Sequence, residues 1–384
     1  MKIEENAILN HTKKTALEIL LNNSRKSTEG LSRTAAWGYP EPYTRDLMLA
    51  ILGVAVSKNE ELIANYKHIL EVLASNQTRR GHIPSLINDK ENRGASDTTP
   101  LFLFGVSIFR KINNQPAFQK KAVKKALKWM KYQSPTDRYL IAQQPTSDWR
   151  DEQWILGYGL FVNTILYAAL KGLGKNKRAT HLAGEIQYLA INNQLTDDIL
   201  DEDVLITLKP YYNSWSYKIY HNDRFDLLGN SIAILTGLAS PKRAKAIIKW
   251  VEQECNIMKE KNMLRGDLPP NFFPFIQPND RDWFDRYAHF NLPGNYHNGG
   301  IWPFITALYI AALVNIKEYE LAENKLIALA HLLKLANQKN RDYGFNEWYK
   351  AQDNTAMGED WQTWSAALYL YASHCVEQRD TPFF

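Results

Sequence analysis

The chain has 384 residues, 45% of them hydrophobic, and no Pro-, Gly- or Ser-rich linker, so we expect one domain with a large core over residues 1–384. Its net charge of +5 looks basic, but the lysines recur at helical spacing beside apolar residues, as in residues 120–128. This spacing is typical of solvated helix faces and argues against a nucleic-acid partner.

Targeting and metal signals are weak in this sequence. Cys255 and Cys375 are too few for a disulfide framework, which favours a reducing compartment. The first residues lack the basic and apolar regions of a signal peptide, and no apolar run reaches about 18 residues. We therefore expect a cytoplasmic protein without a membrane partner. The histidines show no HxxxH or Cys/His ligand spacing, so no metal and no cofactor is implied.

Two kinds of helix alternate along the chain. Amphipathic outer helices are expected at residues 5–24, 59–75, 116–132, 176–192, 242–257 and 318–337. Between them, six short polar and aromatic-rich segments each run into an apolar helix that lacks a polar side. These segments are residues 43–46, 94–97, 147–151, 223–226, 295–300 and 359–364.

This alternation predicts an all-α fold, an (α/α)6 barrel with the polar segments gathered at one end. A helical solenoid would show the same alternation and stays an alternative. The polar segments always precede the buried helix, and this position favours the closed barrel. Strand signals are few: residues 204–209 and 214–221 are expected to form a hairpin or a long loop.

The polar segments and their neighbours are rich in tryptophan beside Asp, Asn, Arg and Gln. An indole ring covers the apolar face of a sugar while polar groups bind its hydroxyls, so this combination indicates a saccharide ligand. Aspartates at helix starts also serve as caps, and about half of these tryptophans are expected to fill the core. The residues concerned are Trp37, Trp149, Trp154, Trp215, Trp283, Trp302, Trp348, Trp361 and Trp364.

Hydrolysis of a glycoside needs one protonated and one ionised carboxyl group. Residues 147–152 offer Asp148 and Asp151, and residues 344–349 offer Glu347. We expect Trp149 and Trp154 to desolvate Asp151 and so to raise its pKa, as a proton donor requires. A separation of roughly 6.5 to 9.5 Å between the two carboxyl groups would indicate inversion, and about 5 Å retention.

Three runs resemble a known family. FDLLGNSIAIL from Phe225, YHNGGIWP from Tyr296 and WQTWSAALYL from Trp361 are similar to signature stretches of the alkaline/neutral invertases, glycoside hydrolase family 100. They also resemble bacterial amylo-α-1,6-glucosidase or glycogen-debranching-type proteins. The resemblance extends from about Tyr43 to Tyr371 and implies an (α/α)6 barrel that inverts the anomeric carbon with an Asp acid and a Glu base.

Matched position by position, the resemblance places the acid at Asp151 and the base at Glu347. Invertases have two arginines after the acid where this chain has Glu152 and Gln153, so Asp148 stays an alternative acid. Residues expected to bind the substrate are Tyr43, Arg45, Asp46, Asp97, Trp149, Asp226, Asn230, His297, Asn298, Trp302, Gln362 and Trp364.

The sequence therefore predicts an inverting glycoside hydrolase that cleaves a small α-glucoside, with sucrose as the first candidate. Another α-glycosidase, such as an α-1,6-glucosidase, a trehalase-like enzyme or a glucosylglycerate hydrolase, is the alternative. A sugar epimerase, which would use histidines as proton carriers, and a non-catalytic sugar-binding protein on the same barrel also stay open. The expected partner is a small saccharide, and the sequence leaves a homo-oligomer open.

Overall fold

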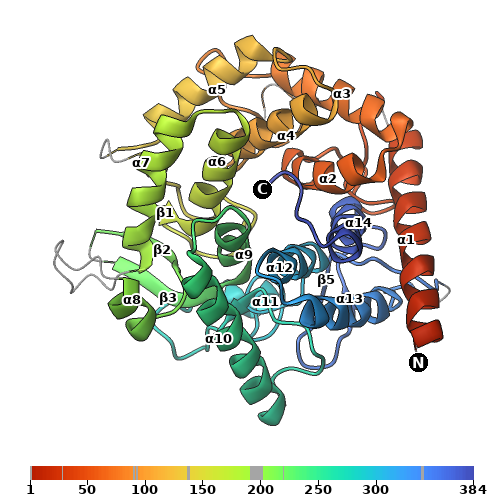
Figure 1. Cartoon of the computed structure of the whole chain (residues 1–384), viewed down its shortest axis with the longest axis vertical. Coiled ribbons are helices and arrows are strands. Elements are labelled where there is room, and N and C mark those ends of the chain that lie inside the picture. Colours follow the sequence, from red (N-terminus) through yellow and green to blue (C-terminus); the bar gives the residue numbers. More distant parts are fainter. Residues whose placement is uncertain are drawn as a thin grey trace.

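Six buried helices form an inner ring in the computed structural model, which describes residues 2–27, 29–89, 91, 94–135, 139–190, 202–218, 220–338 and 341–384 (Figure 1). Most residues of these helices are buried, as their lack of a polar side predicts. They are α2 (Thr44–Ser57), α4 (Thr98–Ile112), α6 (Leu160–Gly172), α9 (Leu227–Leu235), α12 (Pro303–Asn315) and α14 (Thr363–Gln378).

The inner ring is closed. Each inner helix contacts the next one along the chain, and α14 contacts α2, which joins the last hairpin to the first. Gly53 of α2 permits this contact, since a Cβ there would lie 1.9 Å from the backbone oxygen of Ala367 in α14. Closure excludes the solenoid and confirms the (α/α)6 barrel.

Outer helices surround this ring (Figure 1), and most of their charged residues are at least partly exposed. The predicted outer helices are confirmed, with ends that shift by a few residues. They are α1 (Lys2–Arg25), α3 (Glu60–Ser75), α5 (Lys120–Tyr132), α7 (Asn176–Gln187), α10 (Pro241–Glu260) and α13 (Tyr319–Leu333). A 3-10 turn (Tyr188–Ala190) follows α7, and residues 191 and 192 of the predicted helix lie outside the described residues.

Short strands occur only in connections within the described part of the chain. β1 (Tyr158–Gly159), β2 (Asn213–Tyr217), β3 (Tyr220–Asp226) and β4 (Phe272–Phe273) form one antiparallel sheet in that order, and β5 (Trp348–Tyr349) pairs with β6 (Ala356–Met357). Residues 214–217 lie in β2 and residues 220–221 in β3, which pair with each other, so the strand signal at residues 214–221 is confirmed as part of a hairpin. A short helix, α11 (Tyr287–Phe290), lies in the connection before α12.

The strand signal at residues 204–209 was wrong. These residues belong to α8 (Glu202–Leu208), which has two acidic residues in its first turn. Acidic groups near a helix N-terminus are stabilising, and the Thr207 hydroxyl donates to the Asp203 carbonyl one turn back. The acidic charges of the first turn here outweigh the β propensity of the Val, Ile and Thr side chains.

The C-terminal residues cover the end of the barrel where the inner helices finish. The Phe384 ring lies 5.4 Å from that of Phe104 in α4, and the Tyr371 hydroxyl of α14 donates to the Pro382 carbonyl. One large hydrophobic cluster includes residues from Ala16 to Cys375, and a single domain over residues 1–384 stays a prediction. Among the described residues, no helix combines the length and apolar character needed to cross a membrane.

Candidate active site

The polar segments lie at the N-terminal ends of the inner helices, and the closed ring brings these ends together. Contacts between segments far apart in sequence show the convergence. The Arg341 guanidinium before α14 lies 3.7 Å from the ring centre of Trp37 before α2, and 5.0 Å from that of Trp361. Side chains from both ends of the sequence therefore meet at one end of the barrel, as predicted.

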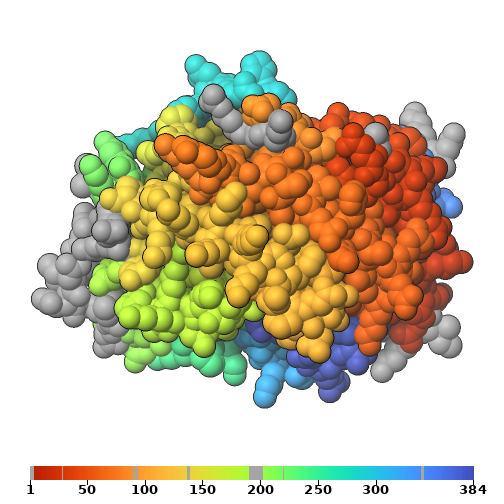
Figure 2. Space-filling model, turned by 90° about the horizontal axis from the view of Figure 1, so that it is seen from above, coloured from red at the N-terminus to blue at the C-terminus, as the bar shows by residue number. Residues whose placement is uncertain are grey.

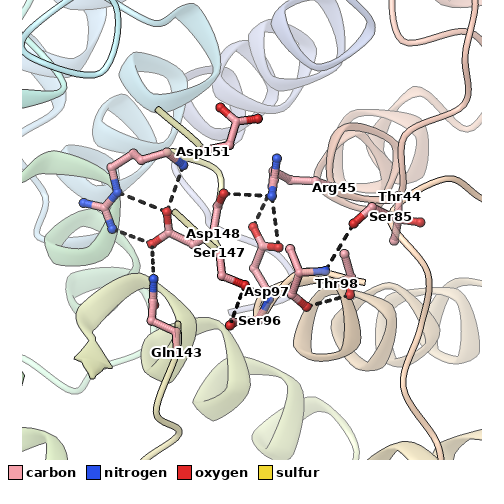
Figure 3. Close-up of polar contacts among 12 residues, drawn as sticks. Thr44, Arg45, Ser85, Ser96, Asp97, Thr98, Gln143, Ser147, Asp148 and Asp151 are labelled. Atoms are coloured by element: carbon pink, nitrogen blue, oxygen red, sulfur yellow. Dashed lines mark hydrogen bonds and ion pairs between the residues drawn. The ribbon is translucent and has the colours of Figure 1, made fainter. Parts of the chain in front are cut away.

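Arg45 connects three of these segments (Figure 3). Its Nε donates to Asp97 Oδ2 at 2.6 Å and its Nη2 lies 3.3 Å from Asp97 Oδ1, so the contact between the two side chains is bidentate. The same Nη2 donates to the Asp148 carbonyl at 2.8 Å. Bidentate Arg–carboxylate contacts have a fixed geometry, so this pair sets the relative position of α2, α4 and the segment before α6.

A second buried arginine holds Asp148. Arg150 Nη2 lies 2.8 Å from Asp148 Oδ2, its backbone N–H donates to Oδ1 at 2.8 Å, and Gln143 Nε2 donates to Oδ2 at 3.2 Å. Arg150 also pairs with Asp226 at 3.1 Å. Burial alone would raise the pKa of Asp148, but the Arg150 guanidinium lowers it below its ordinary value. Asp148 is therefore ionised at neutral pH, and this disfavours it as a proton donor.

Asp151 lies a few residues further along the same segment and differs from Asp148 in its surroundings. Its side chain is 58% exposed and points away from the Asp148 network in Figure 3. The protein around it removes enough water to raise its pKa, Arg45 opposes this effect, and Glu152 adds to it. The predicted direction of the pKa shift is confirmed.

The predicted cause was only partly right. The Trp149 ring is buried edge-on against those of His297 and Trp302, and Trp154 stacks on Phe284 with ring centres 5.0 Å apart. The two tryptophans thus pack against different neighbours. The arginine that acts on Asp151 is Arg45 of α2, which sequence proximity did not indicate.

Glu347 belongs to the same group of carboxyls. Burial raises its pKa to about 8, and the negative charges of Asp46, Asp151 and Glu359 contribute to the rise. Burial likewise raises the pKa of Asp46 to about 7, against the effect of Arg45. Carboxyls that raise each other's pKa do not all ionise together. This group of carboxyls therefore keeps at least one proton at neutral pH.

Aromatic rings form one wall beside the carboxyls. His297 stacks on Tyr296 at 3.9 Å and on Trp302 at 5.5 Å, and Trp364 meets Trp302 edge-on at 5.9 Å. Burial holds the pKa of His297 well below its ordinary value, so its ring is neutral. Its Nε2 lies 3.9 Å from Asp151 Oδ1, which connects the wall to Asp151.

Several predicted ligands use their polar atoms within the protein. The Asn230 amide bonds to the backbone of Tyr212 and Asp226, and the Asn298 amide to the backbone of Ile276 and Asn291. Asp226 caps α9 through the Gly229 N–H and pairs with Arg150. Trp302 Nε1 donates to the Tyr296 carbonyl. These contacts fit a role in shaping the loops.

Other predicted ligands keep buried polar atoms without a partner among the described residues. Both side-chain polar atoms of Gln362 and the indole nitrogens of Trp149 and Trp364 are of this kind. Buried polar groups normally have hydrogen-bond partners, so these atoms are candidates for bonds to a ligand or to water. Tyr43 is half-buried at the start of α2, and its ring meets that of Tyr39 edge-on at 5.9 Å.

Tyr39, Tyr296 and Glu359 also belong to this site but were not predicted from the sequence. Burial raises the pKa of Tyr39 to about 12, and the negative charges of Glu347, Asp151 and Asp46 add to the rise. Burial also raises the pKa of Tyr296, and the negative charges of Glu347 and Asp151 add to this rise. The aromatic run before α2 and the position of Tyr296 beside His297 were the available signals. Within the described residues, no group of His, Cys, Asp and Glu is arranged to hold a metal ion.

A family model described as alkaline and neutral invertase matches residues 219–379. This part of the chain is homologous to the alkaline and neutral invertases. The runs from Phe225, Tyr296 and Trp361 lie inside the match, so the resemblance noted in the sequence is confirmed there. The homologous part contains Glu347 but neither Arg45 nor Asp151, and hence only one side of the site.

Curated plant proteins give the same result over a similar length. The chain is 30% identical over 159 residues to probable alkaline/neutral invertase D of Arabidopsis thaliana, covering 40% of this chain and 27% of that protein. It is 29% identical over 158 residues to cytosolic invertase 1 of Oryza sativa subsp. japonica, covering 40% and 26%. The match thus spans about a quarter of the length of these invertases.

Solved structures resemble the whole barrel. A GH63 mannosylglycerate hydrolase from Thermus thermophilus, solved with glucose, superposes with a TM-score of 0.66 at 14% identity, over 94% of this chain and 99% of that one. A glycosidase variant solved with glucose gives a TM-score of 0.66 at 13% identity, over 97% and 98%. At these identities the likeness is one of fold.

Proposed function

We propose that the protein is an inverting glycoside hydrolase that cleaves the α-glucosidic bond of a small α-glucoside. Asp151 would donate a proton to the leaving oxygen, and Glu347 would activate the water that attacks the anomeric carbon. The observation that carries the proposal is the meeting of these two carboxyls, one before α6 and one before α14, in a group that holds a proton at neutral pH. We expect their oxygens roughly 6.5 to 9.5 Å apart.

The pKa shifts support a shared proton rather than a fixed assignment. The pKa of Glu347 is about 8, so the base would be protonated in much of the free enzyme. Glu347 is ionised when the shared proton resides on Asp151. This protonation state of the two carboxyls is the one that would hydrolyse substrate. In coupled carboxyls the observed pKa values belong to the group, so this form is available without an external acid.

The remaining residues have two kinds of role in the proposal. Arg45, Asp46, Gln362 and the indole N–H groups of Trp149 and Trp364 would bind sugar hydroxyls, with Tyr43 and His297 beside them. Asp97, Asp226, Asn230, Asn298 and Trp302 would position these groups, because their polar atoms already bond to the protein.

Sucrose is the first substrate to test, because the homologous plant proteins are named invertases. Glycosylglycerates belong in the same panel, since one structural neighbour is named a mannosylglycerate hydrolase. A cytoplasmic location is part of the proposal. Two buried free cysteines and a relative named cytosolic support it, although other relatives are named chloroplastic or mitochondrial.

Proton NMR of the purified protein with sucrose, trehalose, maltose, isomaltose and glucosylglycerate tests the proposal. Release of β-glucose in the first minutes from one of them is the expected result, because inversion of an α-glucoside gives the β-anomer. Release of α-glucose would overturn inversion. Substrate binding without turnover would instead indicate a sugar-binding protein.

Matched variants attribute the activity to this site. Glu347→Gln should lower kcat by about 10²–10⁴-fold, the usual contribution of a general base. Glu260→Gln at the exposed C-terminal end of α10 should leave kcat unchanged. Full activity of a folded Glu347→Gln variant would exclude the proposed base.

A further inference from the structure

A groove of about 900 Å³ runs along α5 on the outer wall of the barrel. α5 lies on the face that Figure 2 views. Val123, Leu127 and Leu173 contribute an apolar floor, and the lining includes Arg110 near the C-terminus of α4 and Lys175 before α7. It therefore lies toward the C-terminal ends of the inner helices, whereas the candidate active site lies at their N-terminal ends.

The charged side chains at the edges of this groove are all cationic. They are Lys120, Lys124, Lys128 and Lys131 of α5, Arg110 of α4 and Lys175 before α7. None of the described residues that line the groove is acidic. The sequence around it has the same bias, because no Asp or Glu occurs between Asp97 and Asp137. An occupant of this groove must therefore be anionic.

The floor restricts the occupant further. Lysines on a solvated helix face usually lie over a convex surface, where their stems cover apolar groups. Here the lysines border a hollow, and Tyr132 at its end is 59% exposed. A nucleic-acid backbone would meet an apolar floor without hydrogen-bond partners, and a flat membrane would not enter the hollow. An anionic ligand with an apolar side fits both the edges and the floor.

The spacing of the lysines points to a helix. They recur about once per turn from Lys120 to Lys131, over roughly 16 Å of α5 at 1.5 Å per residue. A helix packed along α5 has the same pitch, so acidic residues on its flanks would meet one lysine at each turn. Coiled-coil helices use this arrangement, with an apolar seam between flanking charges. We propose that the groove binds an acidic amphipathic helix of a partner protein.

A synthetic peptide of this chemistry tests the proposal on the full-length protein. The probe is a helix of about five turns with leucines along one face and glutamates on both flanks, titrated by calorimetry at low salt. A peptide of the same composition in scrambled order controls for charge alone. Phosphatidylglycerol vesicles and a single-stranded oligonucleotide serve as the membrane and nucleic-acid probes.

Two pairs of charge reversals on the same helix give a matched control. Lys124→Glu with Lys128→Glu changes the edge of the groove. Lys121→Glu with Lys125→Glu makes the same change of charge at exposed positions that do not line it. Both double variants should keep the circular dichroism spectrum of the parent.

We expect one peptide to bind per chain and the Lys124/Lys128 pair to weaken binding by about tenfold or more, with less than about twofold for the Lys121/Lys125 pair. Equal losses in both pairs, or equal binding of the scrambled peptide, would show a diffuse charge effect and overturn the proposal. So would the absence of saturable binding. Vesicles or oligonucleotide that bind through Lys124 and Lys128 while the peptide does not would replace it with the corresponding ligand.

Discussion

Gly358 lies directly against the side chain of Glu347. A Cβ at position 358 would be 2.3 Å from Glu347 Oε2 and 2.6 Å from its Cβ, and the φ angle of Gly358 is +67°. The β5–β6 pair that follows Glu347 brings Gly358 back to it, since Trp348 pairs with Met357. The position of the proposed base thus depends on a glycine that shares its short hairpin.

Gly358→Ala should therefore displace Glu347. We expect kcat to fall by about tenfold or more, since small displacements of catalytic groups are costly. The unfolding free energy should fall by about 1–3 kcal/mol, from backbone strain and overpacking. Steady-state kinetics on the active α-glucoside and urea denaturation measure the two effects.

Gly174→Ala is the control for backbone strain. Gly174 has the same φ of +67°, and a Cβ there would meet nothing within 4 Å. This variant should lose stability without losing kcat. If both variants lose kcat equally, the contact between Gly358 and Glu347 does not position the base.

α-Glucosyl fluoride separates the proposed acid from the proposed base. Fluoride leaves with little protonation, so Asp151→Asn should hydrolyse this substrate at nearly the parental rate while losing about 10²–10⁴-fold on the glucoside. Glu347→Gln should be slow on both substrates, because the attack of water is impaired in each. Initial rates of fluoride and glucose release give the comparison.

The opposite pattern would reverse the two roles. Fluoride activity retained in Glu347→Gln and lost in Asp151→Asn would make Glu347 the donor, an assignment that its pKa of about 8 also permits. Asp148→Asn completes the set. If it alone lost glucoside activity and kept fluoride activity, the acid would be Asp148.

The pH profile should report the coupling between Glu347 and Asp46. The last proton shared by this cluster of carboxyls leaves near the pKa of Glu347, which is about 8. We therefore expect kcat/KM to fall above about pH 8. Asp46→Asn removes a negative charge that raises this pKa, so the alkaline limb should move to lower pH. The lower activity of the variant does not obscure the limb, which is read from the shape of the profile.

Asp267→Asn provides the comparison for this shift. Asp267 pairs with Lys259 on the surface and does not belong to the cluster of carboxyls at the candidate site. Its removal should leave the alkaline limb in place. An unchanged limb in Asp46→Asn would mean that Glu347 does not determine it.

The sequence predicted the barrel because its main signal is periodic. Six helices with no polar side must be buried between neighbouring helices, in a ring or in a solenoid. The position of the polar segments favoured the ring, and the structure has this ring. The convergence of Arg45, Asp151 and Glu347 follows from closure of the ring, so it could also be predicted from the sequence. The direction in which side chains point within a loop could not. Trp149 and Trp154 lie close together on the chain and turn to different neighbours, and periodicity carries no information on such turns.

Buried polar contacts were the other part that the sequence concealed. Asn230 and Asn298 occur in runs that resemble invertases, which made them candidates for sugar binding. Their amides satisfy backbone groups of Tyr212 and Ile276, partners that lie 18 and 22 positions away. Only the folded chain shows which polar atoms are already bonded and which, like those of Gln362, are not.

Asp148 should matter for stability rather than for proton donation. It is fully buried and bonds to Arg150 and Gln143, and removal of one partner of a buried ion pair costs about 3–5 kcal/mol. Asp148→Asn should lower the unfolding free energy at pH 7 by about this amount. The pKa of Asp148 is depressed in the folded protein, so its contribution is present above the unfolded pKa of about 3.9 and is lost as the pH falls through the lower folded value.

The difference between parent and Asp148→Asn should therefore shrink as the pH falls below about 4, which denaturation at several pH values will measure. Asp267→Asn is again the control. Its pKa is also lowered, by Lys259, but its side chain is 70% exposed, so its pair should contribute about 0–1 kcal/mol. A loss for Asp148→Asn as small as this would mean that Arg150 is held by Asp226 alone, and the Arg150 network would then not fix the segment that carries Asp151.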